Sequence, residues 1–267
     1  MAMISDALLG PSFPEQGWVP APRYLMRRAR IVDMTRGLRS GRLLETGPGA
    51  GTLLIEFASN GFHCEALELS EEARELAREL IAVSGQNVRI HDAVQPGWEG
   101  RFDYLFSFDV LEHIEDDAGV LKAWASWLKP GGTLLLSVPA RMKLWTAGDE
   151  WAGHFRRYER GQLIDLLQAS GFEIETFECY GFPLTNITER VSASAYRKLI
   201  HRQHDSSELD RQANNDRSGI DRRPHLRLYP LLKSLPGRLA IRFFLATQKL
   251  FLKKDWGSGY IVRARRR

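Results

Sequence analysis

Apolar residues along this chain form short runs of strand length that alternate with longer runs of helical spacing. Residues 102–108 are almost continuously apolar, which is typical of a strand in a parallel sheet covered on both faces. The pattern, with Gly and Pro between the runs, predicts strands at 42–46, 63–69, 87–91, 102–108, 133–138, 172–180 and 258–264. Helices are predicted at 22–38, 50–59, 71–83, 116–128 and 161–169.

The alternation of strand and helix predicts the fold class. Successive strand–helix–strand units require right-handed crossovers and build an open α/β sheet. We therefore expect a doubly wound, Rossmann-like sheet of about seven strands whose last strand is antiparallel. The expected divisions are 1–40, an irregular segment and a helix; 41–182, the main domain; 183–255, a helical, basic insertion; and 256–267, the last strand with a basic tail.

The insertion interrupts the alternation. A helix is predicted at 186–200, with Asn186 and Glu189 as a capping-box pair. Residues 201–224 are polar and nearly free of large apolar side chains, so this segment is expected to be mobile.

A second helix in the insertion is predicted at 238–253. It combines a broad apolar surface with a basic stripe, which falls within an arc of about 60°. The stripe consists of Arg238, Arg242, Lys249 and Lys253. Such a helix suits either a lid that packs on the main domain or contact with an anionic membrane surface. In both cases the helix would lie beside the ligand-binding site of the protein and favour a hydrophobic ligand.

Composition places the chain among ordinary intracellular globular proteins. Apolar residues make up 43% and charged residues 26%, as in a globule with a substantial core. Two cysteines, Cys64 and Cys179, lie far apart in predicted strands, which favours a reducing compartment over a disulfide framework or a zinc site. The N-terminus lacks the basic and apolar regions of a signal peptide, and no apolar run approaches the ~18–20 residues of a membrane span. The expected location is cytoplasmic, or peripheral at the inner face of a membrane.

The net charge of +4 conceals an asymmetry. Residues 183–267 contain 19 basic and 7 acidic residues, a net charge of +12, whereas residues 1–182 contain 18 basic and 26 acidic residues, a net charge of −8. Such segregation often marks a segment that faces a polyanion. An anionic membrane is therefore a candidate partner. Nucleic acid is not expected, because no RNA-binding motif or stacking platform is recognisable.

A glycine-rich turn follows the strand at 42–46. It reads Glu45-Thr46-Gly47-Pro48-Gly49-Ala50-Gly51. Alternating glycines let the backbone turn sharply, and a strand that leads into a helix aims backbone N–H groups at the carboxyl edge of the sheet. The turn indicates nucleotide binding. Thr52 stands where the dinucleotide motif G-x-G-x-x-G requires glycine, and no Lys-Ser or Lys-Thr follows as in a phosphate loop.

Further polar motifs follow the later strands. Glu68 comes 21 positions after Gly47, at the end of the next strand, where one carboxylate can accept from both hydroxyls of a ribose. Asp92 follows the third strand and is placed to accept from an adenine amino group. Asp109-Val110-Leu111-Glu112-His113 follows the fourth strand, and Lys129-Pro130-Gly131-Gly132 precedes the fifth.

In this order and spacing, the motifs between residues 43 and 139 resemble those of the class I S-adenosylmethionine (SAM)-dependent methyltransferases, in the small-molecule branch that includes the quinone-biosynthesis enzymes. The resemblance implies SAM as the cofactor and S-adenosylhomocysteine as the product. It also implies that the glycine turn holds the methionine part, Glu68 the ribose and Asp92 the adenine. The implied cofactor-binding set is Glu45, Gly47, Pro48, Gly49, Gly51, Glu68, Leu69, Asp92, Ala93, Phe108, Asp109 and His113.

A long loop separates the fifth strand from the next helix. Residues 149–158 resemble the D-x-x-x-G-H-x-R-R-Y loop of a subset of bacterial methyltransferases. Histidine has an ordinary pKa of about 6.5, which suits a general base near neutral pH, and Asp149 could orient His154 for that task. Alternatively, Asp149 and Arg157 pin the loop while His154 bonds a backbone carbonyl. The candidate catalytic set is His154, Asp149, Arg156, Arg157 and Tyr158, in which either arginine could hold an acidic acceptor.

The expected reaction is methylation of a small or lipid-like acceptor, with oxygen as the favoured atom. Some relatives use a Glu-His pair such as Glu112-His113 as metal ligands, but no other ligand spacing corroborates it, so no metal is expected. Enzymes that methylate exocyclic amino groups of nucleobases have [DNS]-P-P-[FYW] after the fourth strand, and the sequence after Asp109 lacks those prolines. The alternatives are a non-catalytic SAM-binding protein and, less favoured, an RNA methyltransferase or an NAD-dependent oxidoreductase.

Overall fold

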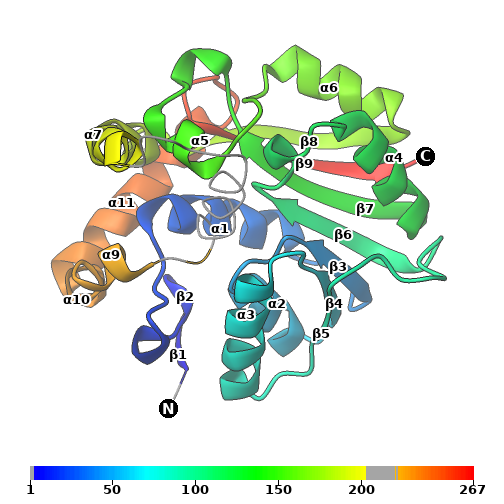
Figure 1. The fold of residues 1–267 in the computed structure, drawn as a ribbon, viewed down its shortest axis with the longest axis horizontal. Coiled ribbons are helices and arrows are strands. Elements are labelled where there is room, and N and C mark those ends of the chain that lie inside the picture. Colours follow the sequence, from blue (N-terminus) through cyan, green and yellow to red (C-terminus); the bar gives the residue numbers. More distant parts are fainter. Residues whose placement is uncertain (1–2, 203–219, 221) are drawn as a thin grey trace.

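The computed structural model describes residues 3–202, 220 and 222–267. Its main sheet contains β3 (Arg42–Thr46), β4 (His63–Leu67), β5 (Arg89–His91), β6 (Phe102–Phe108), β7 (Leu128–Pro139), β8 (Phe172–Tyr180) and β9 (Gly259–Arg266). These seven strands lie in the order β5-β4-β3-β6-β7-β9-β8 (Figure 1). β9 pairs antiparallel with both β7 and β8, which confirms the predicted doubly wound sheet with an antiparallel last strand.

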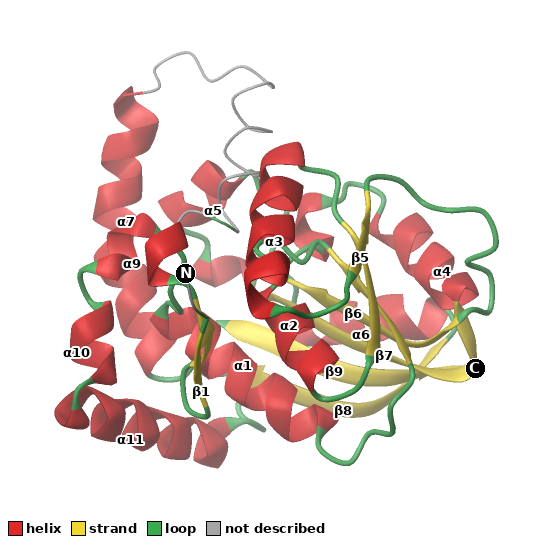
Figure 2. Ribbon diagram, turned by 90° about the horizontal axis from the view of Figure 1, so that it is seen from below, coloured by secondary structure: helices red, strands yellow, loops and turns green. Residues whose placement is uncertain are grey.

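Helices cover both faces of this sheet (Figure 2). The apolar core on one face includes side chains of α1 (Pro22–Thr35), α2 (Thr52–Ser59) and α3 (Glu71–Ser84). The core on the other face includes side chains of α4 (Asp117–Trp127) and α6 (Arg160–Ala169). Because β3, β4, β5 and β6 are mutually parallel, their carboxyl ends meet at one edge of the sheet.

The predicted strands at 42–46, 102–108 and 172–180 match the structure residue for residue. β7 begins five residues before its predicted start, because Lys129-Pro130-Gly131-Gly132 lies within the strand instead of only ending the preceding helix. An irregularity in the β6–β7 register, between Phe102 and Tyr104, accommodates the additional residues.

The N-terminal segment is more ordered than predicted. β1 (Ile4–Asp6) and β2 (Gly10–Ser12) form a separate antiparallel pair, and the 3-10 helix η1 (Pro14–Gln16) follows. Leu9, Phe13 and Trp18 are buried in the core that contains α1 and α2. The expectation of irregular structure before residue 20 was therefore wrong in part. Isolated apolar residues among Gly and Pro have no period, so the pattern did not reveal their packing.

Between β8 and β9 the structure describes α7 (Leu184–Arg202), α9 (Arg223–Leu226), α10 (Tyr229–Lys233) and α11 (Leu235–Phe251). These helices gather at one end of the molecule, on the left in Figures 1 and 2. α7 begins before Asn186, whose Nδ2 donates to the Trp256 carbonyl at 2.9 Å, so the predicted capping pair of Asn186 with Glu189 is wrong. Most of the segment 201–224, predicted to be mobile, lies outside the described residues.

Candidate active site

The glycine turn after β3 adopts left-handed backbone conformations. Gly47, Gly49 and Gly51 have φ angles of 61°, 55° and 70°, in a region that favours glycine. A Cβ atom on Gly47 would lie only 2.5 Å from Cγ2 of Val110. Gly51 then forms the N-cap of α2. The turn therefore needs glycine for its own conformation and for its close approach to β6.

Glu68 follows β4 and holds the turn in place. Its Oε2 accepts a hydrogen bond from the Gly49 N–H and its Oε1 one from the Ser70 N–H, both at 3.1 Å. Leu69, Asp92 and Ala93 lie exposed beyond the ends of β4 and β5. The residues predicted for the methionine, ribose and adenine parts of the cofactor thus lie along one edge of the sheet.

A cavity lies between the glycine turn and the N-terminal segment. Its lining includes Tyr24, Arg27, Glu45, Gly47, Phe108 and Arg222. Glu45 is 3% exposed, and its Oε2 has no hydrogen-bond partner in the part of the chain that the structure describes. Burial raises the pKa of Glu45 to about 8. A cationic ligand group would relieve this isolation, so the site fits SAM, whose amino-acid end carries an ammonium.

Asp109 directly follows β6, has a φ of 56° and is surrounded by donors. Nη1 of Arg27 lies 2.5 Å and Nη2 of Arg23 3.4 Å from its Oδ2, and Ser137 Oγ donates to its Oδ1 at 2.9 Å. Burial would raise the pKa of Asp109, but the two guanidiniums hold it well below its usual range. Neither arginine was among the residues predicted for the site. Arg23 lies 86 positions from Asp109, and only the packing of α1 joins them.

The loop between β7 and α6 is organised by Asp149, which lies in α5 (Ala147–Ala152) and is 2% exposed. Its Oδ1 accepts from Nδ1 of His154 at 2.9 Å, and each of its oxygens accepts from Arg157 at 2.8 Å. These partners outweigh burial and hold the pKa of Asp149 well below its usual range. Asp149 is therefore placed to orient His154 and also pins the loop through Arg157. Among the described residues, the side chain of His154 bonds this carboxylate and no backbone carbonyl.

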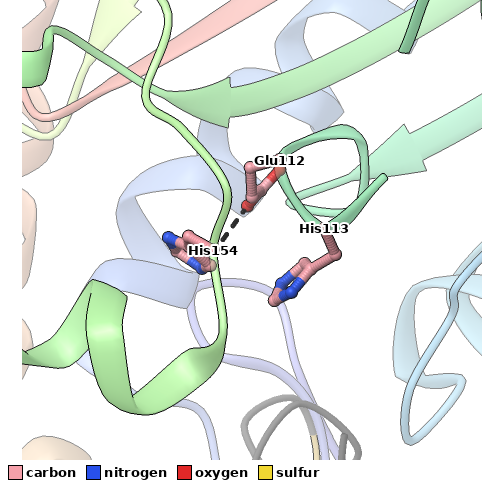
Figure 3. A group of neighbouring side chains, drawn as sticks. All are labelled: Glu112, His113 and His154. Carbon is pink, nitrogen blue, oxygen red and sulfur yellow. Dashed lines mark ion pairs between the residues drawn. The ribbon is translucent and has the colours of Figure 1, made fainter. Parts of the chain in front are cut away.

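Glu112, His113 and His154 form a compact group (Figure 3). The first two come from the 3-10 helix η2 (Leu111–His113), and one ligand atom of each residue lies within 4.8 Å of the others. Nε2 of His154 is 3.9 Å from Oε1 of Glu112, and its ring centroid is 4.7 Å from that of His113. Burial raises the pKa of Glu112 well above its usual range and lowers that of His113 to about 3. Donors of these types can bind a divalent cation, so the expectation of no metal stays a prediction.

Arg156 and Tyr158 both bind Asp117 at the start of α4. Nη1 of Arg156 lies 2.6 Å from Oδ2 of Asp117, and the Tyr158 hydroxyl donates to the same oxygen at 3.0 Å. Arg157 is similarly occupied, by Asp149 and by Glu189 at 3.4 Å. Acidic side chains of the protein therefore already bind the guanidiniums of both arginines. These contacts support a role in stabilising the loop more than the predicted binding of an acidic acceptor.

Comparison with known proteins agrees with this geometry. A family model described as a methyltransferase domain matches residues 22–176, more than half of the chain. A ubiquinone biosynthesis O-methyltransferase from Xanthomonas axonopodis pv. citri is 30% identical over 173 residues, which cover 58% of this chain and 72% of that protein. A protein of the same name from Aromatoleum aromaticum is 34% identical over 110 residues, which cover 40% of this chain and 47% of that protein. The chain thus matches less than half of one relative and over two thirds of the other.

Solved methyltransferases share the fold. An S-adenosylmethionine-dependent methyltransferase from Mesorhizobium loti has a TM-score of 0.55 at 18% identity, covering 92% of this chain and 98% of that one. Phosphoethanolamine N-methyltransferase 2 from Haemonchus contortus, solved with SAM, has a TM-score of 0.53 at 17% identity, covering 90% of this chain and 52% of that one. At these identities the likeness concerns the fold alone. Together with the family model and the relatives, this shared fold completes the assignment: the chain belongs to the class I SAM-dependent methyltransferases, and SAM is its cofactor.

Proposed function

We propose that this protein transfers a methyl group from SAM to an oxygen atom of a small or lipid-like acceptor. The observation that carries the proposal is the Asp149–His154 pair beside Glu112, close to the carboxyl end of β6. Asp149 occupies Nδ1 of His154, which leaves Nε2 available to accept a proton. The O-methyltransferase names of the relatives support oxygen as the acceptor atom.

The side chains divide the work between binding and proton transfer. SAM supplies an electrophilic methyl group when bound. Glu45 and the glycine turn hold its amino-acid end, and Phe108 lines the same cavity. His154 takes the proton of the acceptor hydroxyl at Nε2, while Asp149 keeps the ring in position and stabilises its positive charge. Correct alignment of the reactants can supply about 7–11 kcal/mol at best.

Aromatic side chains near His154 support an acceptor with a hydrophobic or aromatic body. The Trp145 ring centroid lies 6.5 Å from that of His154, and Trp151 packs on Tyr196 of α7 at 5.2 Å. α5 and α7 are in contact, so the insertion lies beside the candidate base. Flat aromatic surfaces favour stacking with an aromatic acceptor.

The proposal is tested by incubating the protein with methyl-labelled SAM and a panel of phenols, other hydroxylated lipids and carboxylic acids. We expect S-adenosylhomocysteine to form together with a product labelled at an oxygen-linked methyl group. Label on nitrogen, or on RNA, would contradict the proposed acceptor class. SAM binding without product from any compound of the panel or from a metabolite extract would favour the non-catalytic alternative.

We predict that Glu68→Ala weakens SAM binding by about 1.5–3 kcal/mol while the fold survives, because the change removes a charged acceptor for the ribose. It also removes the acceptor of the Gly49 N–H. Calorimetry gives the affinity, and thermal unfolding monitors the fold. Glu71→Ala, an exposed carboxylate three positions away, is the matched control and should bind SAM normally. Unchanged affinity in Glu68→Ala would contradict the ribose assignment.

The outer face of α11 supports contact with an anionic membrane. The inner face packs on the main domain as a lid would, and Gln248 donates to the Met26 carbonyl at 3.0 Å. The outer face exposes Leu239, Phe243 and Leu250 by 53%, 65% and 78%. Residues 222–254 include nine Lys and Arg and no acid. We propose that these apolar side chains enter the headgroup region while the basic residues face anionic lipids.

No helix in the described ranges is long and apolar enough to cross a bilayer, so the proposed contact is a surface contact. We predict that the protein floats with anionic liposomes at low salt. A triple variant in which Arg242, Lys253 and Lys254 are all replaced by glutamate should lose this binding and keep its SAM affinity. Arg238 and Lys249 are left unchanged, because they pair with acids of the N-terminal segment and of α1. Lys122→Glu, exposed on α4, is the control. Absence of flotation at low salt would reject the membrane contact.

A further inference from the structure

Arg222 lines the cofactor cavity from a distant part of the chain. Arg222 is the residue before α9, in the segment between β8 and β9. It lines the same cavity as Arg27, Glu45 and Gly47. The part of the chain that joins α7 to α11 therefore contributes a charged side chain to a site otherwise built from the N-terminal segment and the ends of β3 and β6.

Arg222 has no acidic partner within residues 3–202, 220 and 222–267, and its Nε is buried without a hydrogen bond. Arg27, the other arginine in the lining, binds Asp109. Burial, followed by repulsion from Arg27, lowers the pKa of Arg222. A guanidinium whose Nε is buried without a hydrogen bond is costly unless an anion binds it, and a carboxylate can accept two parallel hydrogen bonds from its fork.

The second charge in the cavity narrows the choice of anion. Glu45 lies in the same lining with an unpaired Oε2. Since Asp109 already binds Arg27, the lining offers one acidic group and one basic group for a ligand, which matches the zwitterion of an α-amino acid, whose ammonium and carboxylate are adjacent. A phosphate would suit the arginine, but it offers no cationic group to Glu45, whereas an α-amino acid has a partner for each of the two side chains. We propose that Arg222 binds the carboxylate at the amino-acid end of SAM, so that the insertion completes the cofactor site.

The test compares two ligands that differ only in the amino-acid end. S-adenosylhomocysteine has the carboxylate, whereas 5′-methylthioadenosine lacks the whole amino-acid group. Calorimetry on the full chain should show that Arg222→Gln weakens S-adenosylhomocysteine by about 10- to 100-fold, the range for a charge-assisted hydrogen-bonded pair. Affinity for 5′-methylthioadenosine should change less than about twofold. Arg222→Lys should recover part of the loss, because it keeps the charge without the fork.

Arg227→Gln provides the matched control, since Arg227 lies exposed five positions further along the same segment. Equal loss of both ligands in Arg222→Gln would show that the side chain only shapes the cavity, and unchanged binding of both would show that it makes no contact. Either result overturns the inference while leaving the cofactor assignment intact. If the unmodified protein bound neither ligand, the cofactor assignment itself would fail, and this inference with it.

Discussion

Replacing Gly49 with valine should abolish SAM binding. Gly49 has a φ of 55°, where a β-branched residue is a clear outlier, and forcing it there costs about 1–3 kcal/mol. The branched side chain would also enter the space proposed for the amino-acid end of SAM, and the N–H bond to Glu68 would be disturbed. We expect the affinity measured by calorimetry to fall by more than about a hundredfold, which corresponds to about 2.8 kcal/mol.

Gly85→Val is the matched control for backbone strain. Gly85 caps α3 with a φ of 69°, and no atom lies within 4 Å of a Cβ atom placed there. This variant should lose thermal stability to a similar extent and still bind SAM. Equal SAM affinity in the Gly49 and Gly85 variants would contradict the role of the turn. Binding of NAD and not SAM by the unmodified protein would instead support an oxidoreductase.

The second large effect is expected for His154→Ala. If His154 removes the acceptor proton, its loss should lower turnover by about 10²- to 10⁴-fold, the usual contribution of a general base. SAM affinity should stay close to that of the unmodified protein, because His154 does not line the cofactor cavity. Turnover at saturating SAM, with the affinity measured separately, distinguishes the two quantities.

His91→Ala is the control for loss of a histidine–carboxylate pair. Nε2 of His91 lies 2.8 Å from Oε2 of Glu65, so the removed contact is chemically similar but lies between β4 and β5. This variant should keep its turnover per folded molecule. If His154→Ala lost stability and SAM binding in proportion to its loss of turnover, His154 would have the structural role of holding the loop and would not be the general base.

The elements that the sequence alone determined are those set by local physics. The apolar run at 102–108 became β6 because a strand buried on both faces needs little else to specify it. Ser70 caps α3 through its own side chain, which accepts from the Ala73 N–H at 3.3 Å. The glycine turn was recognisable because its positive φ angles restrict the choice of residue at Gly47, Gly49 and Gly51.

Tertiary structure decided the contacts between charged groups that lie far apart in the sequence. Packing of α1 against the sheet places Arg27 at Asp109, and the start of α9 places Arg222 at the cofactor cavity. The same holds for Asn186, which bonds the Trp256 carbonyl instead of capping a helix. Local spacing reports which residues share a face of one element, but pairing of buried charges depends on how the elements pack. For that reason the motifs predicted which edge of the sheet binds the cofactor, whereas only the fold showed which arginines lie beside that edge.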